Sequence, residues 1–301
     1  MNRKIAANVA AFITVFFWAS AFPLTRIIGD QVTANPLCLM RCLIAAVLMI
    51  VIGLISKNPS MHLGRPKAKI DLLYFFAAGI TGFSLYFICF NKGLETLTSA
   101  ESSVICATAP VITSILVYFF FKERINIIGW VSIMGAFAGV AIMLLWNGVF
   151  SIKVGAFWVL GLSVLFSFYS VISRILTEKG YNSLEIVAYG ALFGSVTMVM
   201  YVPQAVGELT SCSTPALLSV LYLGLMPTGV SYILWSKAIE LSERTSEVTN
   251  YIFVTPLLST IMGFLMIHEV PDAATFVGGA IIIIGVVVFS LKGSPQETLE
   301  K

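Results

Sequence analysis

The sequence predicts an all-α polytopic membrane protein, with ten transmembrane helices arranged as two inverted five-helix halves. Three observations lead to this fold class. Hydrophobic residues make up 58% of the 301-residue chain and charged residues only 11%, with a mean hydropathy of +0.95. A soluble domain carries about 25% charged residues because its surface faces water. In this chain the charges lie between long uncharged stretches, and the second half of the sequence repeats the first.

Ten apolar stretches are long enough for a helix to cross a bilayer, which takes about 20 residues. They lie near residues 8–28, 36–56, 71–91, 99–121, 127–146, 154–174, 184–206, 214–236, 246–267 and 273–291. Within the first stretch, Ala19-Ser20-Ala21 resembles a signal-peptidase site. The apolar run continues past that site to Ile28, and the repeat requires this helix, so we expect it to be retained.

The distribution of Lys and Arg predicts the orientation. With a cytoplasmic N-terminus, 14 of the 18 basic residues fall on the cytoplasmic side. The other side receives Arg26, Arg41, Lys92 and Lys153. Short cytoplasmic loops are enriched in basic residues. We therefore expect both termini in the cytoplasm and the chain in a plasma membrane, the inner membrane of a bacterium.

An internal repeat relates the two halves of the chain. Residues 98–145 match residues 244–291, and the halves run over 8–146 and 154–291, followed by a short cytoplasmic tail at 292–301. The matched pairs include Glu101 with Glu247, Pro110 with Pro256, Glu123 with Glu269 and, with a slight slip in register, Thr81-Gly82 with Thr228-Gly229. Since five helices is an odd number, the second half enters the membrane from the opposite side, as in many secondary transporters.

Several short motifs occur in order along the chain. They are Phe17-Trp18-Ala19-Ser20-Ala21-Phe22-Pro23 with Arg26, Pro36 with Arg41, Ala100-Glu101 through Pro110, Lys122-Glu123, Thr245-Ser246-Glu247, Pro256 and His268-Glu269. This ordered set resembles the EamA-type family of the drug/metabolite transporter superfamily, over roughly residues 8–291. The resemblance implies two EamA repeats, a central cavity between them, and export of small metabolites, often amino acids, without ATP hydrolysis. The sequence also contains no GxxxxGK[ST] loop for a nucleotide.

Two charged residues are placed at or within predicted spans. Arg41 lies about five residues inside the second stretch, and Glu101 begins the fourth at the same outer side. Two interpretations of Arg41 are open. In the structural one, its side chain snorkels to the headgroups or joins an ion pair. In the functional one, it contacts the substrate or forms part of a gate. Glu101 can simply complement a helix dipole. We expect the two side chains to lie near each other at the outer mouth.

The ninth stretch carries a polar stripe. Glu247, Asn250 and Tyr251 share one face if the segment is a continuous α-helix. Such a stripe either lines a hydrated path or forms interhelical hydrogen bonds. Further candidate cavity residues are aromatic, and packing or interfacial anchoring is the alternative for each of them: Trp18, Tyr86, Tyr169, Tyr189, Tyr232 and Trp235. Tyr189 occupies the position in the second half that Arg41 occupies in the first.

Prolines within the spans predict kinks or hinges, because proline removes a backbone hydrogen bond. The candidates are Pro23, Pro110, Pro227 and Pro256. The central cavity is expected between the first, third, fourth, sixth, eighth and ninth stretches.

The sequence contains no motif for the two alternative functions, an intramembrane enzyme and a channel. An intramembrane enzyme needs paired Asp, a Ser/His pair or HExxH at membrane depth, and a channel needs a filter or lined pore. The five cysteines form no CxxC pair and the two histidines lie outside the apolar stretches, so no metal or other cofactor is expected. The expected partners are a small-molecule metabolite and the lipid bilayer, not nucleic acid; the oligomeric state is not readable.

Overall fold

The computed structural model describes residues 3–56, 61–121, 126–146, 154–242, 248 and 250–293, and all regular structure in these residues is helical. Six helical segments among them are long and apolar enough to cross a membrane. They are α1 (Arg3–Ile28), α2 (Ala34–Ile55), Lys69–Leu94, Ser99–Phe120, α8 (Val154–Glu178) and Thr214–Leu241. Three shorter apolar segments lie in α7 (Ile127–Leu145), α14 (Thr255–Ile267) and α15 (Ala273–Val288).

The seventh predicted span, 184–206, is not one straight helix. Helix α9 (Ser183–Thr197) is followed by the 3₁₀ turn η4 (Val199–Tyr201) and by α10 (Val202–Ser211), and the two segments are bent by 60°. Pro203 lies in the first turn of α10, where its missing N–H needs no partner. The same residue could not continue α9 without breaking its hydrogen bonds, which explains the bend.

Two spans are interrupted beside matched prolines. Helix α5 (Ser99–Cys106) ends four residues before Pro110, whose ring would clash with the carbonyl of residue 106 in a continuous helix, and α6 (Ala109–Phe121) begins anew. In the second half, the 3₁₀ turn η6 (Asn250–Val254) precedes α14, which carries Pro256 in its first turn. Pro23, by contrast, lies inside the uninterrupted α1.

Two other spans contain π-helical segments. The segment η2 (Ile80–Ser84) joins α3 (Lys69–Gly79) to α4 (Leu85–Leu94), and η5 (Gly224–Val230), which contains Pro227, joins α11 (Thr214–Leu223) to α12 (Ser231–Leu241). They contain the sequence-matched pairs Thr81-Gly82 and Thr228-Gly229. A π turn inserts an extra residue into the helix and is frequent at functional sites.

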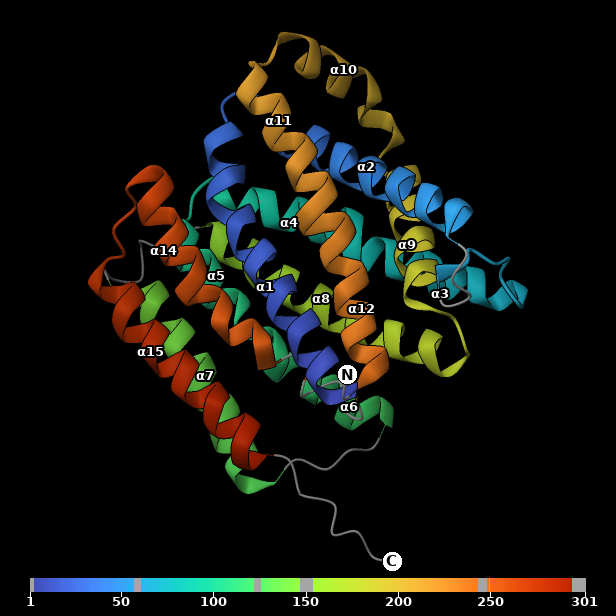
Figure 1. Cartoon of the computed structure of the whole chain (residues 1–301). Coiled ribbons are helices and arrows are strands. Elements are labelled where there is room, and N and C mark those ends of the chain that lie inside the picture. Colours follow the sequence, from blue (N-terminus) through green and yellow to red (C-terminus); the bar gives the residue numbers. More distant parts are fainter. Residues whose placement is uncertain are drawn as a thin grey trace, which may run out of the picture.

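Helices from both halves form the centre of the molecule (Figure 1). Helix α1 lies between α12 and α14, while α4 and α6 pack against α8. Helix α2 packs against α9 and η5. Helices α7 and α15 lie side by side along one flank, and the last segment, η7 (Phe289–Gly293), also contacts α7.

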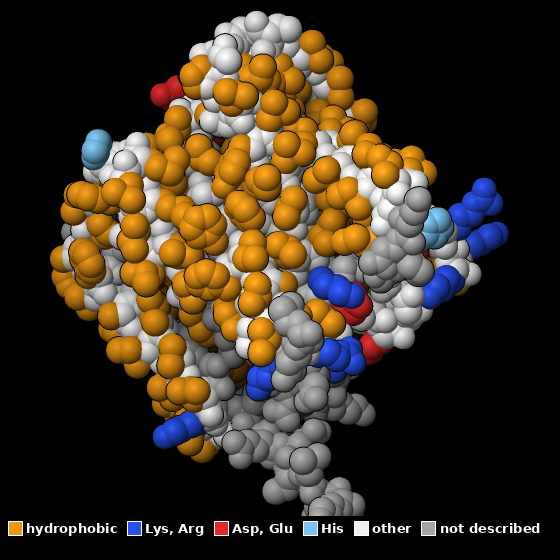
Figure 2. Space-filling view, in the orientation of Figure 1, with side chains coloured by type: hydrophobic (Ala, Val, Ile, Leu, Met, Phe, Trp, Pro, Cys, Tyr) orange, Lys and Arg blue, Asp and Glu red, His pale blue; other side chains and the backbone are white. Residues whose placement is uncertain are grey.

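The outer surface of this bundle is apolar. Leu54, Phe119 and Leu291 expose 77%, 68% and 73% of their surfaces, and Figure 2 shows hydrophobic side chains spread over the visible face. Most of the visible Lys and Arg side chains gather toward one edge. An apolar surface this extensive is incompatible with water and suits lipid, so the chain is a multi-pass membrane protein.

Candidate functional site

A small cavity lies between helices of the two halves. Its volume is about 30 Å³, enough for a water molecule or two. The first half contributes α1, α4, α5 and α6, and the second contributes α8, η6 and α14. The lining residues are Trp18, Phe22, Tyr86, Cys106, Ala109, Leu162, Phe166, Ile252 and Thr255.

Trp18 is fixed by contacts with the second half. Its indole N–H donates a hydrogen bond of 2.9 Å to the Pro227 carbonyl in η5. Its ring centroid lies 4.9 Å from that of Trp235 and 5.3 Å from that of Phe166. One aromatic wall of the cavity is therefore made jointly by α1 and α8, with Trp235 of α12 packed against it.

A fully buried aromatic block lies behind this wall. Tyr169, Tyr232 and Trp235 are at most 1% exposed, and they are not among the residues that line the cavity. The Tyr232 hydroxyl donates to the Gly82 carbonyl in η2 at 2.7 Å. These three candidates therefore support Trp18 and Phe166 by packing, and any contact with a ligand requires the block to rearrange.

Arg41 is buried in the protein, not at the headgroups. It is 2% exposed, and its Nε donates to Thr228 Oγ1 at 3.1 Å. Its guanidinium carbon lies 4.0 Å from the centroid of Phe87 and 5.4 Å from that of Phe90. The side chain thus points into the protein and not toward the outer surface of the bundle. Nor does Arg41 pair with Glu101, which reaches back to Thr98 as the capping box of α5.

At the end of the bundle that the sequence predicts to face outward, an ion pair joins α1 to the segment between α14 and α15. Arg26, at the end of α1, lies 2.5 Å from a carboxylate oxygen of Glu269 and also donates to the Leu97 carbonyl at 2.8 Å. The other oxygen of Glu269 accepts the N–H of Ser99 at the start of α5, at 2.9 Å. Beside this contact is a polar pocket of about 430 Å³, which Arg26, Asn91 and Leu37 help to line.

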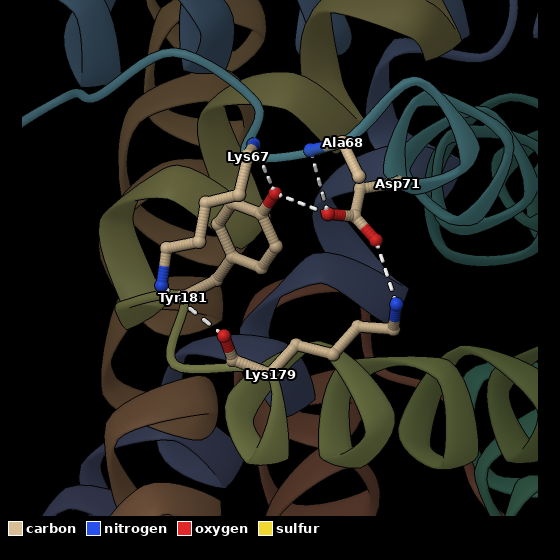
Figure 3. Close-up of polar contacts among 5 residues, drawn as sticks. All are labelled: Lys67, Ala68, Asp71, Lys179 and Tyr181. Carbon is tan, nitrogen blue, oxygen red and sulfur yellow. Dashed lines mark hydrogen bonds and ion pairs between the residues drawn. The ribbon is translucent and has the colours of Figure 1, made fainter.

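At the end of the bundle that the sequence predicts to face the cytoplasm, Asp71 is the centre of a hydrogen-bonded group that joins α3 to the turn between α8 and α9 (Figure 3). Its carboxylate accepts a 2.6 Å hydrogen bond from the Tyr181 hydroxyl and pairs with the Lys179 ammonium at 2.8 Å. The Tyr181 hydroxyl in turn accepts the backbone N–H of Lys67 at 2.6 Å. Lys67 Nζ donates to the Lys179 carbonyl at 3.1 Å.

We call this contact the inner clamp, formed by residues 61–71 against residues 179–189. It continues beyond Asp71: Glu185 accepts the N–H of Gly64 at 3.1 Å, and the Tyr189 hydroxyl donates to the Gly64 carbonyl at 2.7 Å. Tyr189 therefore lies at the inner end and not at the cavity. The clamp links a loop of the first half to a turn of the second.

The polar stripe expected on the ninth span lacks its helical basis. Glu247 lies outside the described residues, and Asn250 and Tyr251 belong to a 3₁₀ turn, so an α-helical face does not connect them. Ile252 and Thr255 line the cavity instead. Phe22, Phe166 and Thr255 also line the cavity, although they were not predicted as cavity residues. Their residue types are common in membrane helices, and only the packing of neighbouring helices brings them together as a wall.

Comparisons with known proteins identify the family of the chain. The model of the EamA-like transporter family matches the chain twice, over residues 5–145 and 153–291. "Uncharacterized transporter YdfC" of Bacillus subtilis (strain 168) is 28% identical over 97% of this chain and 93% of its own length. "Probable terminal-alkyne amino-acid exporter" of Streptantibioticus cattleyicolor is 30% identical over 93% of this chain and 92% of its own.

A solved structure described only as "Crystal structure of protein" has the same fold. It superposes with a TM-score of 0.63 at 19% sequence identity, covering 95% of this chain and 96% of that one. The relatives that carry a functional name are named as transporters. With the double match along almost the whole sequence, the chain belongs to the EamA-like transporter family, part of the drug/metabolite transporter superfamily.

Proposed function

We propose that the protein is a secondary carrier that exports an amino acid or a related zwitterion by alternating access. The observation that carries this proposal is the cavity in the middle of the bundle, lined by helices of both halves. A site between two halves can be exposed to either side when the halves move relative to each other. The relative from Streptantibioticus, named as an exporter of an amino acid, supports this substrate class.

The proposed architecture is ten spans in two inverted repeats. Its support is that irregularities recur at matched positions: π segments contain Thr81-Gly82 and Thr228-Gly229, and helix breaks accompany Pro110 and Pro256. The family model also matches once in each half. Such breaks let helices bend near the cavity, which a carrier requires when it changes conformation.

The topology gives a direct prediction. In a variant without the native cysteines, Glu95→Cys should react with a membrane-impermeant maleimide on intact cells, because the exposed Glu95 follows α4 on the predicted outer side. Arg65→Cys, exposed in the loop before α3, should react only after the membrane is permeabilised. Labelling of both sites from outside, or the reverse pattern, contradicts the proposed orientation.

The cavity composition fits a small zwitterion with an apolar or aromatic side chain. Trp18, Tyr86 and Phe166 offer ring faces, which attract ammonium groups as well as apolar groups. The present volume of about 30 Å³ is too small for an amino acid. In the proposed mechanism, the walls of the cavity must therefore separate for substrate to enter.

Counterflow tests the carrier. Purified protein in liposomes loaded with an unlabelled amino acid should accumulate the same labelled amino acid transiently, because a carrier exchanges substrate faster than net flow occurs. We expect accumulation with at least one amino acid from a panel of apolar, aromatic and hydroxyl side chains. Equilibration without overshoot would instead show a channel, and no uptake of any panel member would contradict the proposed substrate class.

A further inference from the structure

Arg41 is the cation that the spans bury most completely in the described structure. It lies in the middle of the outer half of α2, and its side chain is 2% exposed. Its Nε is bonded to Thr228, but its Nη1 is buried without any hydrogen-bond partner. No carboxylate among the described residues forms an ion pair with it.

Such a group is expensive for a protein to keep. A buried guanidinium loses its hydration, and a neighbouring aromatic ring returns only part of that loss. Phe87 and Phe90 supply this ring contact here. Apolar residues of similar volume would fill the same place at lower cost. An anion that arrives only during function would complete the missing contacts.

Two pockets lie close to the surroundings of Arg41, one on each side. Leu37, one turn nearer the outer end on α2, lines the polar outer pocket, as does Asn91, one turn beyond Phe87 on α4. On the other side, Tyr86, the residue before Phe87 on α4, lines the central cavity. Phe90 contacts the cavity residue Phe22, with ring centroids 5.0 Å apart. Arg41 itself is not among the lining residues of either pocket, but the side chains around it lie next to both.

We propose that Arg41 binds the carboxylate of the transported substrate, and that Phe87 and Phe90 hold its guanidinium while no substrate is bound. The planar fork of arginine matches a carboxylate with two parallel N–H donors, and Nη1 is the donor left without a partner. The substrate class is thus a small carboxylic acid, of which an amino acid is one kind. This assignment rests on the proposed carrier function and names the group that its site recognises.

The hydrogen bond between Arg41 and Thr228 also couples carboxylate binding to the conformation of η5. The second contact of Arg41, Thr228, lies in the π segment η5, where the Thr228 hydroxyl donates to the Leu223 carbonyl at 2.8 Å. The same π segment accepts the Trp18 indole N–H at Pro227. A carboxylate that draws Arg41 away from Phe87 therefore acts on a segment that also holds a wall of the central cavity.

The test compares acids with their neutral amides on the full-length protein in nanodiscs. The probes are L-phenylalanine, L-leucine and L-threonine, each with its carboxamide at equal concentration, and the readout is the thermal unfolding midpoint. At least one acid should raise the wild-type midpoint, since ligands of the native state stabilise it, and its amide should not. Arg41→Gln should raise the acid concentration for a half-maximal shift by about 30-fold or more.

Two further variants keep the result interpretable. Arg41→Lys keeps the charge but loses the fork, so we expect it to weaken acid binding while unfolding normally without ligand. Lys92→Gln removes an exposed cation that pairs with Glu95 on the surface, and it should leave the acid response unchanged. Without ligand, Arg41→Gln should be as stable as the wild type or more so, because an uncompensated buried charge is removed.

Several outcomes overturn the assignment. They are equal stabilisation by acid and amide, no stabilisation by any acid, an Arg41→Gln variant that keeps the wild-type response, or failure of both Arg41 variants to fold, which would make the residue structural. Counterflow distinguishes a failure of the carboxylate assignment to Arg41 from a failure of the proposed carrier function. If amides or amines are exchanged by wild type and Arg41→Gln alike, the carrier stands and the carboxylate assignment falls.

Discussion

Replacing Gly82 with alanine should destabilise the protein by about 3 kcal/mol, the largest effect that we expect from adding a single methyl group. A Cβ at position 82 would clash with Cδ2 of the Tyr169 ring and would lie 2.7 Å from two further ring atoms. Tyr169 cannot retreat easily, because it is fully buried among Phe83, Phe166 and Tyr232. The ring or the π segment must therefore shift.

The measurement is thermal or denaturant unfolding of Gly82→Ala beside a matched control. Gly135→Ala adds the same methyl group in α7, where no described atom apart from the adjacent helix backbone lies within 4 Å of the new Cβ. Alanine is the better helix former, so this control should gain about 0.5–1 kcal/mol. Equal stability of the two variants would show that the close approach of η2 to Tyr169 is not a feature of the folded protein.

The second large effect is expected at the inner clamp. Asp71→Ala removes the acceptor shared by Tyr181, Lys179 and the N–H of Ala68. Asp71 is 3% exposed, so water replaces these contacts poorly, and we expect the unfolding midpoint to fall by roughly 5 °C or more. Hydrogen exchange at Lys67 and Ala68 should accelerate, because Asp71 accepts the N–H of Ala68 and holds the Tyr181 hydroxyl that accepts the N–H of Lys67.

The control for this variant is Glu95→Ala. Glu95 also accepts an ion pair, from Lys92 at 2.7 Å, but both side chains are exposed, at 49% and 38%. Exposed pairs of this kind contribute about 0.5 kcal/mol or less. If Asp71→Ala were no more damaging than Glu95→Ala, the inner clamp would not stabilise the contact between the two halves.

The clamp should not act as a pH switch in the neutral range. The hydrogen bond to Asp71 raises the pKa of Lys179 above its usual 10.5, and burial followed by the same carboxylate raises the pKa of Tyr181 above 10.0. Both groups hold protons more tightly in the folded state. Their contribution is therefore complete below about pH 10 and is lost as the pH rises through the raised pKa values. The difference in midpoint between wild type and Asp71→Ala should stay constant from about pH 6 to 9 and shrink above 10.

Prolines and repeats were the sequence features with the most direct structural counterparts. Pro110 and Pro256 accompany helix breaks because proline acts through its own ring and its missing N–H, independently of distant residues. The bend before Pro203 follows from the same chemistry, although the sequence-based boundary of 184–206 overlooked it. Trp18 and Tyr86, singled out by depth and residue type, do line the cavity.

The face of a helix on which a side chain lies was harder to predict than its position along the helix axis. A π turn adds one residue, which rotates everything beyond it by about 100° relative to a regular helix. Faces assigned by regular periodicity are therefore lost across η2 and η5. The 3₁₀ turn at Asn250–Val254 has a similar effect, and it moves the cavity contacts to Ile252 and Thr255.

The sequence by itself determined the membrane class, the family and the positions of the main apolar spans, because these depend on composition, segment length and ordered local motifs. Only the tertiary structure decided which side chains meet. It placed Arg41 against Phe87 and not at the headgroups, and it brought Asp71 to Tyr181 across 110 residues. These contacts depend on how separate helices are rotated and packed, which is set by many weak interactions distributed over the whole chain.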